Sequence, residues 1–301
     1  MKLRLKQSNL SQQKMRPLLQ PIHTTHTPES LVEQLRGEPG IVLLRSGFFE
    51  SQQARYSFVT ARPFLTLRSS GSRCEIASAE SRSVQFGNPW HLLDSFMARY
   101  ELLEEIDSPF PLGGCFGYWG YDLKNFVEPK LPRAAVNDLE LPDCAVGFYD
   151  SLVVFDHRLD KTWIVSTGLE ADGSRNEAKA EAHLQFWQAT ISKQESKAEE
   201  TPQRDRPIES ENPGDASLLV NSNLSRAEFV SKVEQAQRYI FAGDIYQVNL
   251  SQRLAAILSL SGWDFFQRLS SVSPAPFSAY LDCGDFQIAS SSPESFLRMS
   301  G

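Results

Sequence analysis

The sequence predicts a globular protein that mixes helices and strands. Its composition, 41% hydrophobic and 22% charged over 301 residues, is that of an ordinary folded domain. Short apolar or alternating segments between turn residues indicate strands, and apolar residues at helical spacing recur among them. Composition and periodicity alone indicate no more than this mixed fold, since they do not say how the elements are layered.

The first 192 residues carry most of the strand patterns. Six segments are expected as strands because they are apolar or alternate between apolar and polar residues: 41–44, 56–60, 64–67, 144–149, 152–156 and 162–167. Helices are expected at 90–103 and 175–192. The stretch 110–122 interleaves glycines with aromatic residues, which lets another backbone or a ligand come close. It lacks the Lys and Ser/Thr of a phosphate-binding loop.

A charged segment divides the chain. Between Lys193 and Asp215 the only aliphatic residue larger than alanine is Ile208, so this segment cannot bury enough surface to offset its ordering entropy. We therefore expect a flexible N-terminus at 1–20, a folded region at 21–192, a linker at 193–216 and a second region at 217–301.

The second region opens with a helix. Ser225 and Glu228 have the spacing of a capping box, and Gly243 suits the position that ends a helix. Strands are expected at 245–250, 253–257, 277–281 and 287–290, with a short helix before the last two.

Several functional classes are excluded by the bulk properties. The net charge is −7 and there is no basic run, which argues against nucleic-acid binding. No apolar stretch reaches the roughly 20 residues that a membrane helix needs. Four scattered cysteines without CxxC spacing favour neither zinc nor a disulfide framework, so we expect a cytoplasmic protein with reduced thiols.

From the residues alone, two places are candidates for chemistry. Glu294 follows a serine-rich turn with proline, which could orient a carboxylate, although a solvated role is the more common one for such a residue. Gln247, Asn249 and Ser251 share one side of an expected strand. If that side faces inward they need polar partners, such as a ligand, and otherwise they face solvent.

Five motifs resemble those of the chorismate-utilising family, which includes anthranilate synthase component I and aminodeoxychorismate synthase component I. They cover nearly the whole chain and occur in the family's order: RYSFVTARP at 55–63, PLGGCFGYWGYDL at 111–123, LPDCAVGFYDSLVVFDH at 141–157, GDIYQVNLSQR at 243–253 and SSPESFL at 291–297. The resemblance implies an α+β fold, an antiparallel β-sandwich with outer helices that is incomplete at the C-terminus. Residues 21–192 are then the family's N-terminal region and 217–301 the start of its chorismate-binding domain.

Within the family, the segment Ala275–Leu281, Asn249 and Ala145–Asp150 look more like the aminodeoxychorismate branch than the anthranilate branch. That branch aminates chorismate to 4-amino-4-deoxychorismate for p-aminobenzoate and folate synthesis. A separate glutamine amidotransferase subunit supplies ammonia, and Mg²⁺ holds the substrate. Because hydroxide is a poor leaving group, an acid must protonate it. By its match to the family's Ser-Pro-Glu, Glu294 takes that role, although Ser295 replaces the family's usual Arg.

The resemblance also implies a tryptophan site in the N-terminal region. Its members would be Ser46, Arg55, Tyr56, Pro276, Phe277 and Ser278. Tryptophan-inhibited relatives often have Glu before that first serine, whereas Arg45 stands here. We therefore expect weak or absent feedback by tryptophan.

Motifs that the family carries after this point do not occur in the sequence, including the one that holds the nucleophilic Lys and the glutamates that bind Mg²⁺. We therefore expect an incomplete form of an enzyme subunit, with no metal ligand of its own. The 301 residues expressed alone are expected not to convert chorismate with ammonia and Mg²⁺. The alternatives are anthranilate synthase component I, or a non-catalytic module that binds tryptophan or docks the amidotransferase.

Overall fold

The computed structural model describes residues 16–47, 54–102, 107–133, 138–193 and 219–297. The chain forms two compact units, one of residues 1–196 together with 262–301 and one of residues 197–261. The last forty residues thus pack with the N-terminal region, whereas the sequence placed them with 217–261. The limits of the domains that the family resemblance implied stay a prediction.

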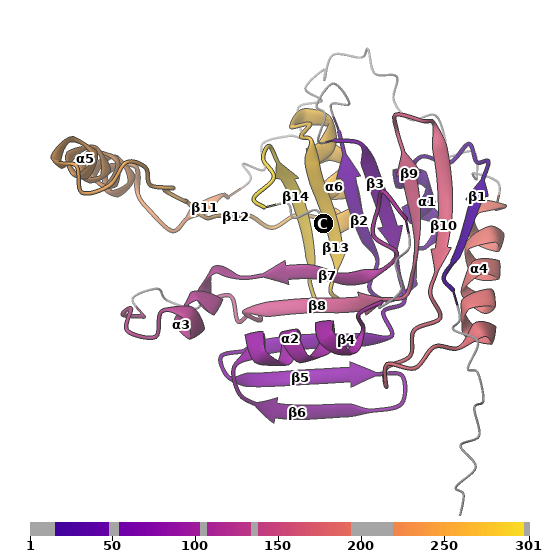
Figure 1. Cartoon of the computed structure of the whole chain (residues 1–301). Coiled ribbons are helices and arrows are strands. Elements are labelled where there is room, and N and C mark those ends of the chain that lie inside the picture. Colours follow the sequence, from indigo (N-terminus) through magenta and orange to yellow (C-terminus); the bar gives the residue numbers. More distant parts are fainter. Residues whose placement is uncertain (1–15, 48–53, 103–106, 134–137, 194–218, 298–301) are drawn as a thin grey trace, which may run out of the picture. The chain divides into compact units, whose positions relative to one another are not determined.

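A seven-stranded antiparallel sheet is the centre of the first unit (Figure 1). Its strands, in spatial order, are β1 (Leu18–Ile22), β10 (Lys161–Ser166), β9 (Ser151–Asp156), β3 (Tyr56–Thr60), β2 (Val42–Ser46), β13 (Phe277–Asp282) and β14 (Gln287–Ser292). Strand β13 pairs with β2 along Phe277–Leu281, so the two ends of the described chain contribute neighbouring strands to one sheet.

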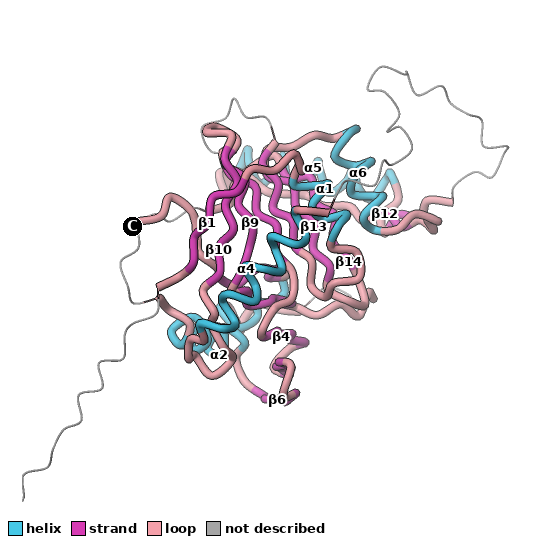
Figure 2. The backbone as a smooth tube through the Cα atoms, turned by 90° about the vertical axis from the view of Figure 1, so that its right-hand side faces the viewer, coloured by secondary structure: helices cyan, strands magenta, loops and turns pink. Residues whose placement is uncertain are grey.

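Three helices cover one face of this sheet, α1 (Pro28–Gln34), α4 (Glu177–Ile191) and α6 (Gly262–Val272). Figure 2 shows α4 along β10 and β9. The apolar side chains between helices and sheet form one buried cluster, in which Trp187, Phe266 and Leu43 are fully buried. Burial of such large side chains supplies the main stabilising free energy of the unit.

A second antiparallel sheet of five strands belongs to the same unit, in the order β6 (Arg82–Phe86), β5 (Arg73–Ser78), β4 (Leu65–Ser70), β8 (Cys144–Tyr149), β7 (Gly114–Trp119). Helix α2 (Pro89–Arg99) packs on one face through Phe96. In β7, Gly117 has φ 155°, and a Cβ there would lie 2.2 Å from the carbonyl oxygen of Ala145. Only glycine fits this close approach between strands.

The turn between β13 and β14 is attached to the five-stranded sheet. Arg68 of β4 donates a hydrogen bond of 2.6 Å to the carbonyl of Cys283 and pairs with Asp285. Its guanidinium also lies over the ring of Phe286, which meets Tyr118 edge-on with 6.0 Å between ring centroids. This contact holds the C-terminal hairpin against the second sheet. The two antiparallel sheets with helices outside confirm the expected α+β fold.

Some elements differ from the sequence prediction. Strand β1 begins at Leu18, inside the N-terminus that was expected to be flexible; residues 1–15 of that segment lie outside the described residues. The predicted linker at 193–216 also lies outside them, except for Lys193. Besides β1, the elements that were not expected as such are α1, β5, β6, β7, the 3-10 helix at Tyr121–Leu123, α3 (Lys124–Val127) and β11 (Asn221–Ser222). Strand β6 is exposed along its whole length, and only Val84 and Phe86 alternate with polar residues, which is too short a pattern to predict a strand.

The second unit contains α5 (Arg226–Ala242) and a two-residue ladder between β11 (Asn221–Ser222) and β12 (Leu254–Ala255). Helix α5 has the predicted capping box and ends at Gly243 in the left-handed region, with φ 81°. The strand expected at 245–250 was wrong, and 253–257 is reduced to β12. A strand needs a paired neighbour, and the strand pairing among the described residues of this unit is that of β11 with β12.

Among the described residues, no helix is long and apolar enough to cross a membrane.

Candidate functional site at one end of the seven-stranded sheet

One end of the seven-stranded sheet gathers most of the residues that the sequence singled out. The register pairs Ser46 of β2 with Phe277 of β13, and Phe277 with Ser292 of β14. On the other side of β2, Tyr56 begins β3 and pairs with Asp156 at the end of β9. Five strands therefore present polar or aromatic residues at the same end.

Ser46 is buried and holds this end together. Its hydroxyl donates a 2.7 Å hydrogen bond to the carbonyl of Tyr56, and its N–H donates to the hydroxyl of Ser57 at 3.0 Å. The next N–H, of Gly47, donates to the carbonyl of Pro276. A Cβ on Gly47 would lie 2.7 Å from the carbonyl oxygen of Ala275, so the backbone of β2 approaches the segment before β13 closely.

Side-chain alternation divides the predicted tryptophan-site residues between two faces of the sheet. Ser46, Tyr56 and Phe277 share one face, because directly paired residues of an antiparallel ladder point the same way. Ser278 pairs with Arg45 on the opposite face, where it is buried and its hydroxyl donates to the carbonyl of Ala275.

Arg55 forms a two-pronged ion pair with Asp156. Its Nε lies 3.0 Å from Oδ1 and its Nη2 2.6 Å from Oδ2, while the guanidinium also lies over the Tyr56 ring. The Asp156 carboxylate is only 2% exposed. Burial acts to raise the pKa of this carboxyl, but the hydrogen bonds from Arg55 and from the N–H groups of Leu159 and Arg158 outweigh burial and hold the pKa below its ordinary value. Arg55 is therefore oriented by a partner that is ionised at neutral pH.

His157 and Ser57 occupy the helix-covered side of the same sheet end. The Nε2 atom of His157 lies 2.7 Å from the hydroxyl of Ser57. Burial lowers the pKa of His157, with the nearby charges of Glu29 and Asp156 opposing that shift and Arg45 adding to it. Arg45 itself pairs with Glu29 at the start of α1. Sequence reasoning missed Ser57, Asp156 and His157, although all three lie inside motifs that it quoted.

Comparison with known proteins identifies the family. The family model for chorismate binding enzymes matches residues 46–301, which is most of the chain. The chain belongs to the chorismate binding enzyme family.

The most similar curated relatives include both branches of the family. Aminodeoxychorismate synthase component 1 of Escherichia coli (strain K12) is 32% identical over 260 residues, covering 86% of this chain and 51% of the relative. Anthranilate synthase component 1 of Acetivibrio thermocellus is also 32% identical, over 275 residues, covering 91% of this chain and 54% of the relative. The chain thus spans about half the length of the curated relatives it matches.

A solved structure supports the fold. Anthranilate synthase component I from Streptococcus pneumoniae TIGR4 superposes with a TM-score of 0.59 at 24% sequence identity, over 82% of this chain and 52% of that one. The family resemblance and the α+β fold expected from the motifs are therefore both confirmed, at the level of the chorismate-utilising family.

Glu294 lies two residues beyond the end of β14, and its side chain is exposed. The hydroxyl of Ser292 donates to the backbone carbonyl of Glu294 at 3.1 Å, which shapes the turn but does not engage the carboxylate. The register brings Ser292 beside Phe277, so Glu294 leaves the sheet at the same end as Ser46 and Tyr56. Its catalytic role stays a prediction.

Gln247, Asn249 and Ser251 belong to the second unit, where they are exposed and outside any strand. The alternation argument that grouped them required a strand, and that strand is absent from the described residues. The neighbouring Gln252 and Arg253 are held instead, since Gln252 donates to the hydroxyl of Ser222 and the N–H of Arg253 donates to the Asn223 side chain.

In the described part of the chain, no group of three His, Cys, Asp or Glu side chains could hold a metal ion. Among the described residues, this polar sheet end offers Asp156, His157, Glu29 and exposed Glu294; Asp156 is paired with Arg55, and Glu29 with Arg45. These residues do not fit a Mg²⁺ site.

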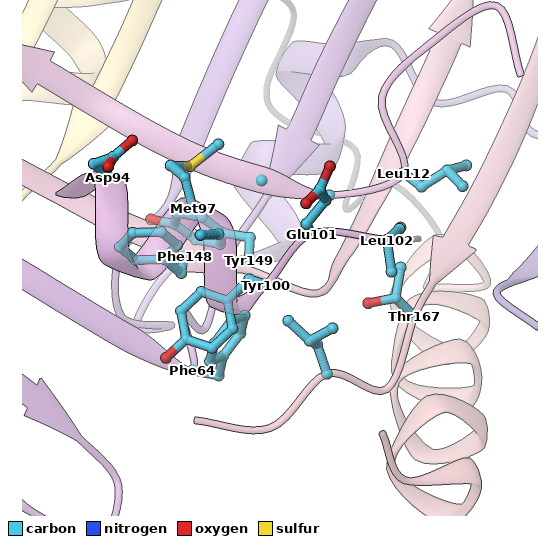
Figure 3. A pocket seen from close by; sticks show the side chains of 14 residues that line it. Phe64, Asp94, Met97, Tyr100, Glu101, Leu102, Leu112, Phe148, Tyr149 and Thr167 are labelled. Atoms are coloured by element: carbon cyan, nitrogen blue, oxygen red, sulfur yellow. The ribbon is translucent and has the colours of Figure 1, made fainter. Parts of the chain in front are cut away.

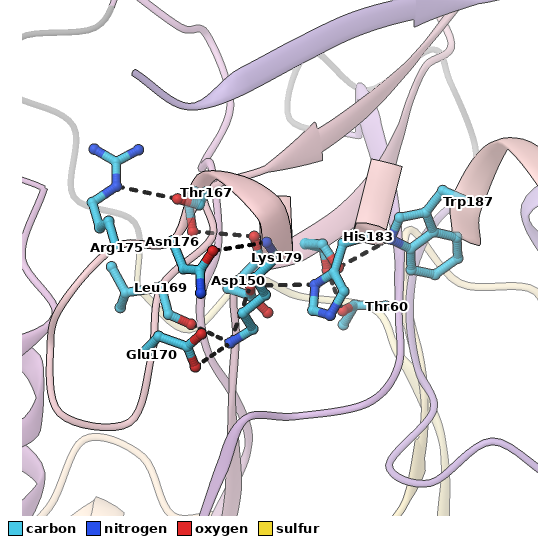
Figure 4. Close-up of polar contacts among 11 residues, drawn as sticks. Thr60, Asp150, Thr167, Leu169, Glu170, Arg175, Asn176, Lys179, His183 and Trp187 are labelled. Atoms are coloured by element: carbon cyan, nitrogen blue, oxygen red, sulfur yellow. Dashed lines mark hydrogen bonds and ion pairs between the residues drawn. The ribbon is translucent and has the colours of Figure 1, made fainter. Parts of the chain in front are cut away.

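A second polar cluster lies where β8 leads into β9 (Figure 4). The carboxylate of Asp150, 1% exposed, lies 3.2 Å from Nδ1 of His183 and 3.5 Å from Nζ of Lys179, both on α4. Lys179 also pairs with Glu170 at 3.3 Å. The ammonium of Lys179 thus lies near two carboxylates, and the N–H and hydroxyl of Thr167 donate to the Asp150 carbonyl. This cluster fixes α4 to the junction of the two sheets, which is a structural role.

Proposed function

We propose that this chain is part of an aminodeoxychorismate synthase component I, which aminates chorismate to 4-amino-4-deoxychorismate in p-aminobenzoate and folate synthesis. The observation that carries the proposal is the similarity to relatives named aminodeoxychorismate synthase component 1, at 32% and 31% identity over 86% and 88% of this chain. The segment Ala275–Leu281, which resembles that branch, forms the start of β13 at the polar sheet end.

Glu294 is proposed as the general acid that protonates the departing hydroxyl of chorismate. Its exposed carboxylate at the end of β14 is accessible to a substrate. Protonating an oxygen leaving group within hydrogen-bond reach typically accelerates a reaction by about 10² to 10⁴. Mg²⁺ is proposed as cofactor from the family resemblance alone, and no described residue is assigned to it.

The proposed nitrogen source is ammonia from a glutamine amidotransferase subunit. The family's division into numbered components supports a partner of this kind. No surface of this chain is assigned to it.

The gene that encodes this sequence can be tested in two auxotrophic bacterial strains, one lacking aminodeoxychorismate synthase component I and one lacking anthranilate synthase component I. Rescue of growth without p-aminobenzoate supports the proposal if the Glu294→Gln variant loses it. The control variant, Glu234→Gln on the exposed surface of α5, should retain it. Because the 301 residues alone are expected not to convert chorismate, the gene is tested together with whatever codons follow residue 301 in its reading frame. Rescue of neither strain then contradicts an activity of either branch.

A second candidate, anthranilate synthase component I, is favoured by the Acetivibrio thermocellus relative, which is as similar as the Escherichia coli one. Rescue of the tryptophan auxotroph alone would favour it. Product analysis separates the two directly, because anthranilate has lost the enolpyruvyl side chain that 4-amino-4-deoxychorismate keeps, and the masses of the two products therefore differ.

Tryptophan feedback is proposed to be weak or absent. Arg45 replaces the Glu of inhibited relatives, and it pairs with Glu29 on the face opposite Ser46, Tyr56 and Phe277. Titration of tryptophan into the active enzyme checks this proposal, and inhibition at micromolar tryptophan would contradict it.

A further inference from the structure

A pocket of about 500 Å³ lies in the first unit, away from the polar sheet end (Figure 3). Its walls come from α2 and the residues after it, from the start of β7, from the end of β8 and from the segment after β10. It therefore occupies the place where the five-stranded sheet continues into the seven-stranded one. A volume in this range is that of sites that hold small organic molecules.

The floor of the pocket is aromatic. Phe64, Tyr100 and Phe148 line it and contact one another, with ring centroids 5.0 Å apart for Phe64 and Tyr100 and 5.3 Å for Tyr100 and Phe148. The hydroxyls around this floor are already used, since Tyr100 donates to the carbonyl of Ala171 and Tyr149 to that of Gly40. Nζ of Lys179 already lies over the Phe64 ring, 5.0 Å from its centroid, so the floor offers the remaining ring faces and edges rather than hydrogen-bond donors.

The rim is acidic. Asp94, Met97 and Ala98 follow the i, i+3, i+4 spacing of one face of α2, Glu101 lies two residues beyond its end, and all four line the pocket. In Figure 3 the carboxylates of Asp94 and Glu101 lie above the ring of Tyr100 in the view. Within the described part of the chain, no Lys or Arg forms an ion pair with either carboxylate.

We propose that this pocket binds a small organic cation, a primary amine carried on an aromatic or aliphatic body. The apolar body would pack on the rings, where removal of apolar surface from water is favourable. The ammonium would lie at the rim near Asp94 or Glu101, and the ring faces that Lys179 does not cover attract cations as well. An anion of the same shape would be repelled by the two carboxylates. The proposal is independent of chorismate chemistry, because chorismate is itself an anion.

The experiment titrates three probes of similar shape into the intact chain and follows them by ligand-observed NMR. Phenethylamine carries the cation, phenethyl alcohol is the neutral match and 3-phenylpropionate the anionic one. We expect saturable binding of the amine, about tenfold weaker binding of the alcohol, which corresponds to the loss of two exposed charge interactions, and no saturable binding of the anion.

Variants locate the binding. Asp94→Asn and Glu101→Gln should each weaken amine binding about threefold, as expected for one solvent-exposed charge pair. Asp160→Asn is the matched control, because it removes one exposed carboxylate far from the pocket lining, and its left-handed backbone (φ 48°) suits Asn. Met97→Trp enlarges a half-exposed lining side chain and should abolish binding of all probes without altering the core.

Four outcomes would overturn the proposal. These are the absence of saturable amine binding, equal binding of the amine and the alcohol, amine binding unaffected by both acidic substitutions, and amine binding retained in Met97→Trp. Circular dichroism of each variant, compared with the unaltered chain, shows that a loss of binding is not a loss of fold.

Discussion

Each of the two units has a long helix that begins at a side-chain N-cap, but the two helices are buried to very different extents. Helix α4 in the first unit buries Trp187 completely, whereas α5 in the second unit has its capping box, its left-handed Gly243 and no buried residue at all. Local signals are therefore enough to set the ends of a helix. Burial depends on partner elements, and in the first unit these come from strands far apart in the sequence.

The largest expected change in stability comes from comparing the replacement of one phenylalanine in each unit. Phe266→Ala removes a fully buried ring stacked on Trp263 and should lower the free energy of unfolding by about 4 kcal/mol. Phe241→Ala alters a ring that is 91% exposed and should change it by less than about 0.5 kcal/mol. Urea unfolding followed by tryptophan fluorescence measures the first unit, which holds all five tryptophans, and far-ultraviolet circular dichroism follows the helix of the second unit. Equal effects would mean that α5 is packed as tightly as α6.

A second contrast uses two glycines with positive φ. Gly117→Ala places a Cβ 2.2 Å from the carbonyl of Ala145 and should destabilise the first unit by about 3 kcal/mol. Gly243→Ala meets no atom within 4 Å, so only its left-handed backbone opposes the change, at about 1 kcal/mol. Thermal unfolding measures the stability of both variants. A larger loss of stability in Gly243→Ala than in Gly117→Ala would contradict this prediction.

The smallest contrast concerns two carboxylates with lowered pKa. The folded-state pKa of Asp156 lies below its unfolded value, so its ion pair with Arg55 stabilises the fold above about pH 4 and loses that contribution as pH falls through the folded pKa. Asp156→Asn should therefore cost about 2 kcal/mol at pH 7, and this cost should shrink as the pH falls below about 4. Unfolding measured across this pH range checks the difference.

Glu228 supplies the matched carboxylate of the second unit. The N–H and hydroxyl of Ser225 lower its pKa, but the side chain is exposed. Glu228→Gln should leave the unfolding of the first unit unchanged at every pH and reduce only the helical content of α5. A pH-dependent effect on the first unit would contradict this separation.

The sequence predicted the elements whose residues alternate or repeat clearly. Tyr56–Thr60 and Cys144–Tyr149 were predicted to the residue, because apolar side chains fill at least one face of each strand. It missed β5 and β6, which have short or absent apolar alternation, and it assigned a strand to 245–250 from alternation without a partner. Pairing is a tertiary property, so periodicity alone cannot supply it.

For the candidate site, the motifs selected the segments that meet at one end of the seven-stranded sheet, but not all of the side chains that contact one another there. Ser46, Tyr56 and Phe277 share a face, whereas Ser278 points to the opposite one, and the sheet register that decides this is not written in any single segment. Asp156 and His157 had no separate signal, since a lone carboxylate or imidazole at a strand end is common. The Asp150 cluster depends on α4 meeting the β8–β9 junction, which only the three-dimensional fold reveals.

The attachment of Arg68 to Asp285 has a consequence for how the chain folds during synthesis. These residues are 217 positions apart, and β13 pairs with β2 across a comparable separation. Until the ribosome has released β13, β2 has an unpaired edge in the middle of what becomes the sheet. Such late, long-range pairing slows folding and leaves a transient strand edge open to aggregation. The nascent chain is thus expected to depend on chaperones more than a chain whose neighbouring strands are also neighbours in sequence.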